Sequence, residues 1–307
     1  MTITVLGSGS WGTALAVLLG KKRYQVRLWG LPEESAAIRR DGENRRYLPG
    51  VALPPTVCAT ADLDHALAAC EMVVLAIPSA GVRDVTARLS GRITGEVLLV
   101  HQTGSRCVAL SGPNLAVELA NDVPTATVVA SSDVDRAAMA QEVFSAPSLR
   151  VYRNSDIVGV ELGGALKNVL AIGAGISDGL GYGDNTKATV VTRGLVEMTR
   201  LGLALGADAR TFTGLSGFGD LMATCASGLS RNLRLGRMLG QGKTPEESLA
   251  ALGQVAEGMP TCRAAYLLSR RHDVYMPITE QIHQVLFQGK APREAVHDLM
   301  SRDHKEE

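Results

Sequence analysis

The sequence lacks the side-chain patterns that bind metal ions or build disulfide frames. Its five cysteines are scattered without a CxxC pair, and its six histidines form no HxxxH or HExxH spacing. Zinc sites and metalloprotease helices need such spacings, so we expect no metal site. An odd number of scattered thiols is typical of a reducing compartment.

An excess of charge of either sign is also absent, with 31 Lys and Arg against 31 Asp and Glu. This balance gives no overall attraction to nucleic acid or to an anionic membrane surface, although a local basic pocket is still possible. No uncharged apolar run reaches the roughly 20 residues that span a bilayer. The chain also starts without a basic, cleavable leader. We therefore expect a cytoplasmic protein with no nucleic-acid partner and no membrane span.

Short β-branched runs alternate with helical stretches up to about residue 153, and from Ser155 onward the pattern is helical. Several runs are apolar throughout, as strands covered on both faces must be. The sequence therefore predicts an α/β protein, with a doubly wound (Rossmann) sheet domain over 1–153 and an all-α domain over 154–307. The predicted strands are Ile3–Leu6, Gln25–Trp29, Met72–Ala76, Glu96–Val100, Cys107–Leu110, Ala126–Ala130 and Leu149–Tyr152.

A glycine-rich turn follows the first predicted strand. Gly7, Gly9 and Gly12 have the GxGxxG spacing at a strand-to-helix turn, which is the context of a dinucleotide site. Gly7 would form the tight turn, Gly9 would let a pyrophosphate approach the backbone, and Gly12 would let the helix pack closely. The alternative is that these glycines serve only a turn.

The sequence leaves the choice between NAD and NADP open. A strict NAD site usually has an acidic residue at the end of the second strand, but here Trp29-Gly30-Leu31 follows, and Glu33 and Glu34 come slightly late. Four arginines downstream could bind a 2′-phosphate or form a solvated helix face; they are Arg39, Arg40, Arg45 and Arg46. Pro78 follows a further strand at the expected cofactor edge, or it simply ends that strand.

One lysine lies within an apolar predicted helix, Val158–Ile172. Burial of Lys167 is costly unless the ammonium has a partner or faces a pocket, and burial favours acid–base chemistry near neutral pH. The alternative is a side chain that reaches solvent past its apolar neighbours. Asp220 and Thr224, spaced i, i+4, would share a helix face and could hold this ammonium. Alternatively, Asp220 only caps a helix after Gly219.

A phosphate-binding segment is predicted at Ser230-Arg231-Asn232, before a helical stretch from Leu233 to Leu239. Ser230 could cap that helix, and the Arg231 guanidinium suits phosphate oxygens. A surface arginine is the alternative.

These segments, in this order, resemble the bacterial NAD(P)-dependent glycerol-3-phosphate dehydrogenases over nearly the whole chain. The motifs that carry the resemblance are Gly7–Gly12, Tyr47–Gly50, Leu110–Asn114, Glu161–Asn168, Gly179–Asn185, Gly219–Leu221, Ser230–Asn232, Gly253–Gly258 and Met276–Glu280.

The resemblance implies hydride transfer between NAD(P)H and dihydroxyacetone phosphate, giving sn-glycerol 3-phosphate for phospholipid synthesis in a cytoplasmic homodimer. It implies that Lys167 is the catalytic acid–base and that Asp220 and Thr224 support it. The implied substrate-binding residues are Gly112, Asn114, Lys167, Asp220, Ser230, Arg231 and Asn232. The implied cofactor contacts are Ser10, Trp11, Ala116, Arg231, Val255 and Glu257, beside Gly7, Gly9, Gly12 and Pro78.

The sequence departs from that family after Val100. Family members continue with a Lys-Gly pair and a helical crossover, and their lysine contacts cofactor and substrate, whereas His101-Gln102-Thr103 follows here. A parallel crossover needs about a dozen residues or more, yet six residues separate Val100 from Cys107. We therefore expect a segment to be absent, seen as a break in Cα spacing within 101–106. The alternative is an antiparallel hairpin.

Two other functions remain open at this stage. A related two-domain hydroxyacid dehydrogenase would act on a carboxylate substrate instead. If the lysine-containing segment is truly deleted, the chain would be a dinucleotide sensor without catalytic activity.

Overall fold

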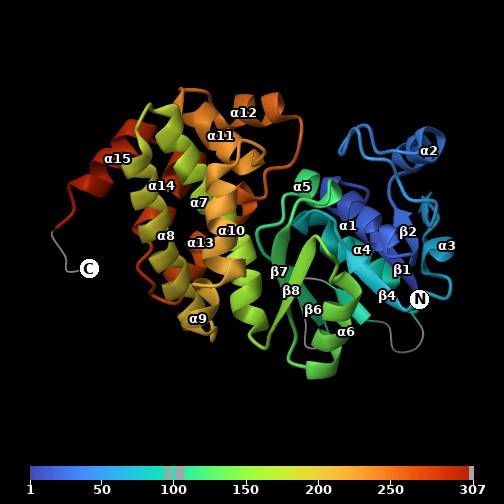
Figure 1. Cartoon of the computed structure of the whole chain (residues 1–307). Coiled ribbons are helices and arrows are strands. Elements are labelled where there is room, and N and C mark those ends of the chain that lie inside the picture. Colours follow the sequence, from blue (N-terminus) through green and yellow to red (C-terminus); the bar gives the residue numbers. More distant parts are fainter. Residues whose placement is uncertain (94–97, 101–106, 304–307) are drawn as a thin grey trace. The chain divides into compact units, whose positions relative to one another are not determined.

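The computed structural model describes residues 1–93, 98–100 and 107–303 (Figure 1). Contacts divide the chain into two units, Met1–Ile157 and Val158–Glu307. Each unit has its own hydrophobic core, one around the sheet and helix α1 (Ser10–Lys21) and one around helix α7 (Ile157–Gly179). The units are therefore described separately.

The first unit is an eight-stranded sheet in the order β3-β2-β1-β4-β5-β6-β7-β8. Every neighbouring pair is parallel except β6 and β7. The strands are β1 Thr2–Leu6, β2 Gln25–Trp29, β3 Val57–Thr60, β4 Met72–Leu75, β5 Leu98–Val100, β6 Cys107–Ser111, β7 Thr125–Ala130 and β8 Leu149–Asn154. The remaining helices are α2 Pro32–Asp41, α3 Leu63–Leu67, the short 3-10 turn η1 Ser79–Gly81, α4 Val82–Leu89, α5 Ala116–Ala120 and α6 Val134–Phe144.

The predicted doubly wound sheet is confirmed, with two differences. Strand β3 was not predicted because it is a four-residue edge strand that is only half-buried, so it has no apolar run. The sheet is also mixed, because β6 and β7 are antiparallel.

Strands β5 and β6 are parallel, so the antiparallel-hairpin alternative is wrong. Their register overlaps by two residue pairs, Leu99 with Cys107 and Val100 with Val108. The predicted break in Cα spacing within 101–106 lies outside the described residues.

All the regular elements among the described residues of the second unit are helices, as predicted (Figure 1). Its elements after α7 are α8 Asp184–Ala204, α9 Ala209–Phe212, the π-helical turn η2 Leu215–Gly219, α10 Asp220–Ala226, α11 Arg231–Gly240, α12 Pro245–Leu252, α13 Gly258–Arg271, α14 Pro277–Phe287 and α15 Pro292–Met300.

Helix α7 is the one helix of the described chain long and apolar enough to cross a membrane. More than half of its most apolar window is buried within the protein. The charged residues Glu161 and Lys167 lie within this helix, so its sequence contains no uncharged run long enough to span a bilayer. Its burial fits a core helix, whose apolar surface faces other helices.

Glycines let α7 and α11 approach closely. A Cβ atom on Gly175 would lie 2.2 Å from the carbonyl oxygen of Leu233, and one on Gly236 would lie 2.1 Å from that of Ile172. Such contacts exclude any larger residue at these positions. This close approach fixes the register between α7 and α11. It also brings together Asn168 of α7 and Asn232 of α11, each of which lies one turn from the contact between Ile172 and Gly236.

A buried carboxylate ties α8 to the start of α14. Glu197 is 2% exposed, and it accepts hydrogen bonds from the backbone N–H groups of Ile278 (2.6 Å) and Thr279 (3.0 Å) and from the Thr279 hydroxyl (3.0 Å). Burial raises the pKa of Glu197 to about 7, although these hydrogen bonds act in the opposite direction. The folded protein therefore binds this proton more tightly than the unfolded chain.

We predict that Glu197 makes stability fall as the pH rises. Because its folded pKa is raised from 4.5 to about 7, its contribution to the free energy of unfolding is greatest below pH 4.5 and is lost towards pH 7. The loss is about 3 kcal/mol. Thermal unfolding of wild type and Glu197→Gln between pH 5 and 8 should show a melting-temperature difference that changes with pH. Glu246→Gln, at an exposed glutamate, is the control, and a constant Glu197→Gln difference would contradict the assignment.

Candidate active site

A part-buried ion pair joins helices α7 and α10 of the second unit. The Lys167 ammonium on α7 donates a hydrogen bond to Asp220 Oδ2 on α10. The Asp220 side chain is 3% exposed and that of Lys167 is 19% exposed. Lys167 is therefore held by a carboxylate inside the protein, and the alternative in which it reaches solvent past its neighbours is wrong.

Close backbone packing one helical turn away brings these two charges together. A Cβ atom on Gly163 would lie 2.5 Å from the carbonyl oxygen of Ser216, so α7 and the π turn are in direct backbone contact. Lys167 follows Gly163 by four residues, and Asp220 follows Ser216 by four. Each charged residue therefore lies about one turn from the backbone contact, on the same face of its own element. π-helical turns of this kind occur frequently at functional sites.

Thr224 completes this cluster on α10. Its hydroxyl donates to Asp220 Oδ1 over 3.4 Å, as the i, i+4 spacing predicted. Asp220 is the first residue of α10 and its Oδ2 atom faces Lys167, so the interpretation of Asp220 as only a helix cap is wrong.

Next to Thr224, burial raises the pKa of the Cys225 thiol to about 12, which keeps it protonated and unreactive.

A second polar chain connects α7 to the start of α11. Asn232 Nδ2 donates to Asn168 Oδ1 over 2.8 Å, and Asn232 Oδ1 accepts from the backbone N–H of Gly258 over 2.9 Å. Asn168 is the neighbour of Lys167 in the sequence. Asn232 is thereby held next to the α7 segment that carries the lysine.

Helix α11 begins with the predicted cap. The Ser230 hydroxyl accepts a hydrogen bond from the backbone N–H of Leu233 over 3.2 Å. Arg231 is exposed at the first helical position and lies within electrostatic range of Glu257. A basic side chain next to a helix N-terminus is an arrangement that suits a phosphate group.

The glycine-rich turn of the first unit fits a dinucleotide. A Cβ atom on Gly12 would lie 1.9 Å from the carbonyl oxygen of Gly7, and one on Gly7 would lie 2.4 Å from that of Ala76. A Cβ atom on Gly9 would meet nothing within 4 Å, so the space in front of Gly9 is open. Helix α1 starts there with no side-chain cap and no acidic residue in its first turn, which leaves it open to an anion.

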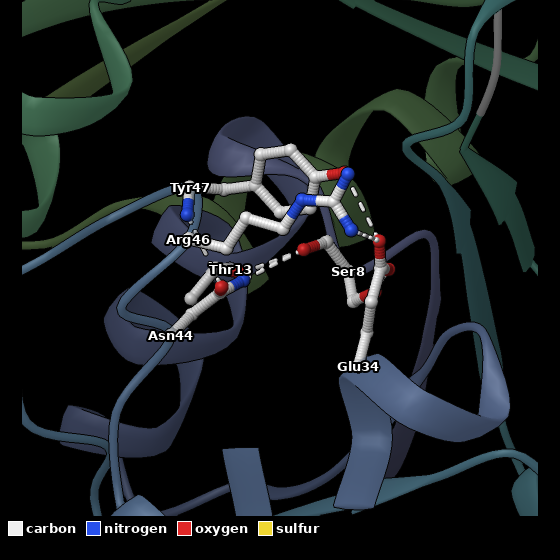
Figure 2. A network of polar contacts seen from close by, with 6 residues as sticks. All are labelled: Ser8, Thr13, Glu34, Asn44, Arg46 and Tyr47. Atoms are coloured by element: carbon white, nitrogen blue, oxygen red, sulfur yellow. Dashed lines mark hydrogen bonds and ion pairs between the residues drawn. The ribbon is translucent and has the colours of Figure 1, made fainter. Parts of the chain in front are cut away.

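Polar side chains hold this turn in place (Figure 2). Asn44 Nδ2 donates to the carbonyl oxygen of Ser8 over 2.7 Å and to the Thr13 hydroxyl oxygen over 2.8 Å. The Ser8 hydroxyl donates to Glu34 Oε2 over 2.8 Å. The sequence reasoning did not identify Ser8 or Asn44 as site residues. No local pattern marks them, because their contacts join residues 26 and 36 positions apart.

The other predicted site residues are distributed over both units. Gly112 and Asn114 lie beside β7, where Asn114 Nδ2 donates to the Thr127 hydroxyl over 2.8 Å. The rest begin or precede helices or lie in loops; they are Ser10 and Trp11 at the start of α1, Pro78 before η1, Ala116 at the start of α5, the exposed Val255, and Glu257 before α13.

Two family models match the chain, the N-terminal and C-terminal parts of NAD-dependent glycerol-3-phosphate dehydrogenase. The first matches residues 2–104 and 99–137, and the second matches residues 156–297. The chain belongs to this family. It is accordingly an NAD(P)-dependent oxidoreductase.

Individual members of the family are similar over nearly their whole lengths. The chain is 49% identical to a glycerol-3-phosphate dehydrogenase [NAD(P)+] of Pelotomaculum thermopropionicum, covering 98% of this chain and 93% of that one. The corresponding protein of Moorella thermoacetica is 47% identical, with 100% and 97% covered. The crystal structure of the Coxiella burnetii glycerol-3-phosphate dehydrogenase superposes with a TM-score of 0.94 at 37% identity, with 98% and 99% covered.

The comparisons also bear on the short connection after Val100. The Moorella alignment spans 327 positions and the chain has 307 residues, so at least 20 positions carry no residue of this chain. The N-terminal family model matches in two pieces that overlap at residues 99–104. The relatives therefore have residues that this chain lacks, and the division of the match coincides with the predicted missing segment.

We predict that alanine at Gly12 lowers stability, whereas alanine at Gly9 weakens cofactor binding. Gly12→Ala should lower the melting temperature, because overpacking against the Gly7 backbone costs about 1–3 kcal/mol. Gly9→Ala should fold normally, since Gly9 has a backbone conformation open to alanine and free space around it. It should nevertheless weaken NADH binding by roughly 1.5–3 kcal/mol through lost backbone contacts to phosphate. Thermal unfolding and calorimetric titration with NADH test both, and normal NADH affinity in Gly9→Ala would count against the pyrophosphate position.

Proposed function

We propose that this chain transfers hydride between NAD(P)H and C2 of dihydroxyacetone phosphate, giving sn-glycerol 3-phosphate. The part-buried Lys167–Asp220 ion pair in a member of this family is the observation that carries the proposal. The nicotinamide cofactor supplies the hydride. The protein must position the ketone, polarise it and provide a proton.

Lys167 is the residue that provides the proton. Its ammonium polarises the C2 carbonyl and donates a proton to the oxygen on C2 as negative charge develops there. Asp220 accepts a hydrogen bond from the ammonium and orients it, and Thr224 orients the carboxylate. The support for these roles is the geometry of the cluster and the match of its residues to the family motif.

Arg231 and the start of α11 bind the substrate phosphate in this proposal. The capped helix end and the exposed guanidinium supply complementary positive charge, and Asn232 is held beside the lysine segment by Asn168. Gly112 and Asn114 are assigned to the substrate on the family resemblance alone. The same resemblance supports action as a cytoplasmic homodimer that supplies phospholipid synthesis.

A second function, dinucleotide binding without catalysis, is favoured by one observation. The Moorella alignment has at least 20 positions without a residue of this chain, and the N-terminal family model divides at residues 99–104. The family resemblance places a Lys-Gly pair directly after Val100, where this chain has His101-Gln102. A dihydroxyacetone phosphate reduction assay with NADH and NADPH in parallel separates the two functions. Reduction supports the dehydrogenase, and cofactor binding without reduction supports the sensor. Turnover of small keto acids in preference to dihydroxyacetone phosphate would instead indicate a hydroxyacid dehydrogenase.

We predict that Lys167→Ala lowers kcat by about 100- to 10,000-fold, the usual effect of losing a positioned acid–base. Lys167→Arg should lose a similar factor, because a guanidinium can pair with Asp220 but does not release its proton. Both should retain NADH affinity, measured by calorimetry. A variant that keeps more than about a tenth of the wild-type kcat would contradict the assignment.

We predict that Arg231→Ala weakens the binding of dihydroxyacetone phosphate through loss of a charge-assisted contact of roughly 1.5–3 kcal/mol. The measurement is the Kd for the substrate in a dead-end complex with the oxidised cofactor. Arg234→Ala is the matched control, since Arg234 is exposed one turn further along α11. An unchanged Kd in Arg231→Ala, or an equal rise in Arg234→Ala, would rule out the phosphate role.

A further inference from the structure

The carboxylate of Glu34 faces the glycine-rich turn and belongs to a small network (Figure 2). Its Oε2 atom accepts from the Ser8 hydroxyl over 2.8 Å, and its Oε1 atom accepts from the Tyr47 hydroxyl over 3.0 Å. Burial raises the pKa of Tyr47, and the hydrogen bond to Glu34 raises it further, so Tyr47 remains a donor. The Glu34 side chain is only 13% exposed. Its two oxygens are therefore held in one place.

A side chain on Gly30, the residue directly after β2, would collide with Ser8 as it lies in this structure. In strict NAD sites an acidic residue at the end of the second strand binds the ribose 2′-hydroxyl. Here a Cβ atom on Gly30 would lie 2.1 Å from the Ser8 hydroxyl oxygen. The Ser8 side chain occupies that space and connects it to Glu34. Glu34, from the first turn of α2, therefore supplies the carboxylate that the strand end lacks.

The arginines that could bind a 2′-phosphate already have partners. Arg39 donates to the carbonyl oxygen of Ala59 over 2.9 Å, and Arg46 pairs with Glu34 over 3.3 Å. Arg40 pairs with Asp41, and Arg45 pairs with Asp41 and Glu43. Residues 33–46 contain four acidic residues and four arginines, so this region has no net positive charge to attract a phosphate.

We propose that Glu34 determines cofactor specificity, binding the adenosine ribose 2′-hydroxyl of NAD(H) and repelling the 2′-phosphate of NADP(H). This inference rests on the proposed function only in placing a dinucleotide at the Gly7–Gly12 turn. An ionised carboxylate has about four acceptor positions. Ser8, Tyr47 and Arg46 use three of them. One position is left for a ribose hydroxyl, whereas a phosphate dianion would meet a like charge.

The experiment measures binding of NADH and NADPH separately by calorimetric titration of the full chain. Wild type should bind NADH at least about tenfold more tightly than NADPH, because like charges brought together in a binding contact are costly. Glu34→Gln, which keeps an acceptor for Ser8 but removes the charge, should narrow that ratio by at least about threefold. Glu33→Gln is the matched control, since Glu33 is exposed in the same helical turn.

Three results would overturn the proposal. They are equal or tighter binding of NADPH by wild type, an unchanged ratio in Glu34→Gln, or an equal change in Glu33→Gln. If Glu34→Gln fails to fold, the proposal is tested by comparing the affinities of wild type for 5′-AMP and for adenosine 2′,5′-bisphosphate, which differ in the 2′-phosphate. Weaker binding of the bisphosphate supports the proposal, and equal or tighter binding contradicts it. NADH binding without reduction of dihydroxyacetone phosphate would contradict the proposed reaction and leave the specificity of Glu34 standing.

Discussion

The ion pair between Lys167 and the buried Asp220 is the constraint on which the helical unit depends. Two opposite charges inside a protein must meet with good geometry, because removing one partner typically costs about 3–5 kcal/mol. That geometry is set by backbone contact one turn away, between Gly163 and Ser216. A second backbone contact joins α7 to α11, where Gly236 packs against the carbonyl oxygen of Ile172, and one turn away Asn232 is hydrogen-bonded to Asn168. A single apolar helix thus carries two small-residue surfaces that bring the polar groups together.

The sheet unit uses the same principle on its glycine-rich turn. Gly12 lies so close to Gly7 that no side chain fits, and the space in front of Gly9 stays open. Asn44, distant in sequence, fixes the turn through the Ser8 carbonyl. The backbone at the start of α1 is therefore fixed by contacts within the protein, and a fixed backbone lowers the ordering cost of binding at a proposed pyrophosphate site.

The sequence predicted those features that local patterns determine. Apolar runs located most strands, and the i, i+4 spacing placed Thr224 beside Asp220. The edge strand β3 was missed because it is short and half-exposed. The Glu34 network was missed because it depends on Ser8 filling the space above Gly30, which only tertiary packing shows. The pairing of the downstream arginines with nearby carboxylates likewise has no sequence signature, since a free and a paired arginine look identical there.

The central claim is that Lys167 and Asp220 act as one unit in proton transfer. A double-mutant cycle on kcat for dihydroxyacetone phosphate reduction, with Lys167→Ala, Asp220→Ala and the double variant, tests it most directly. Residues that act as a unit are strongly non-additive. The account predicts that the double variant is no slower than Lys167→Ala alone. Losses in the two single variants that add fully in the double variant would contradict it.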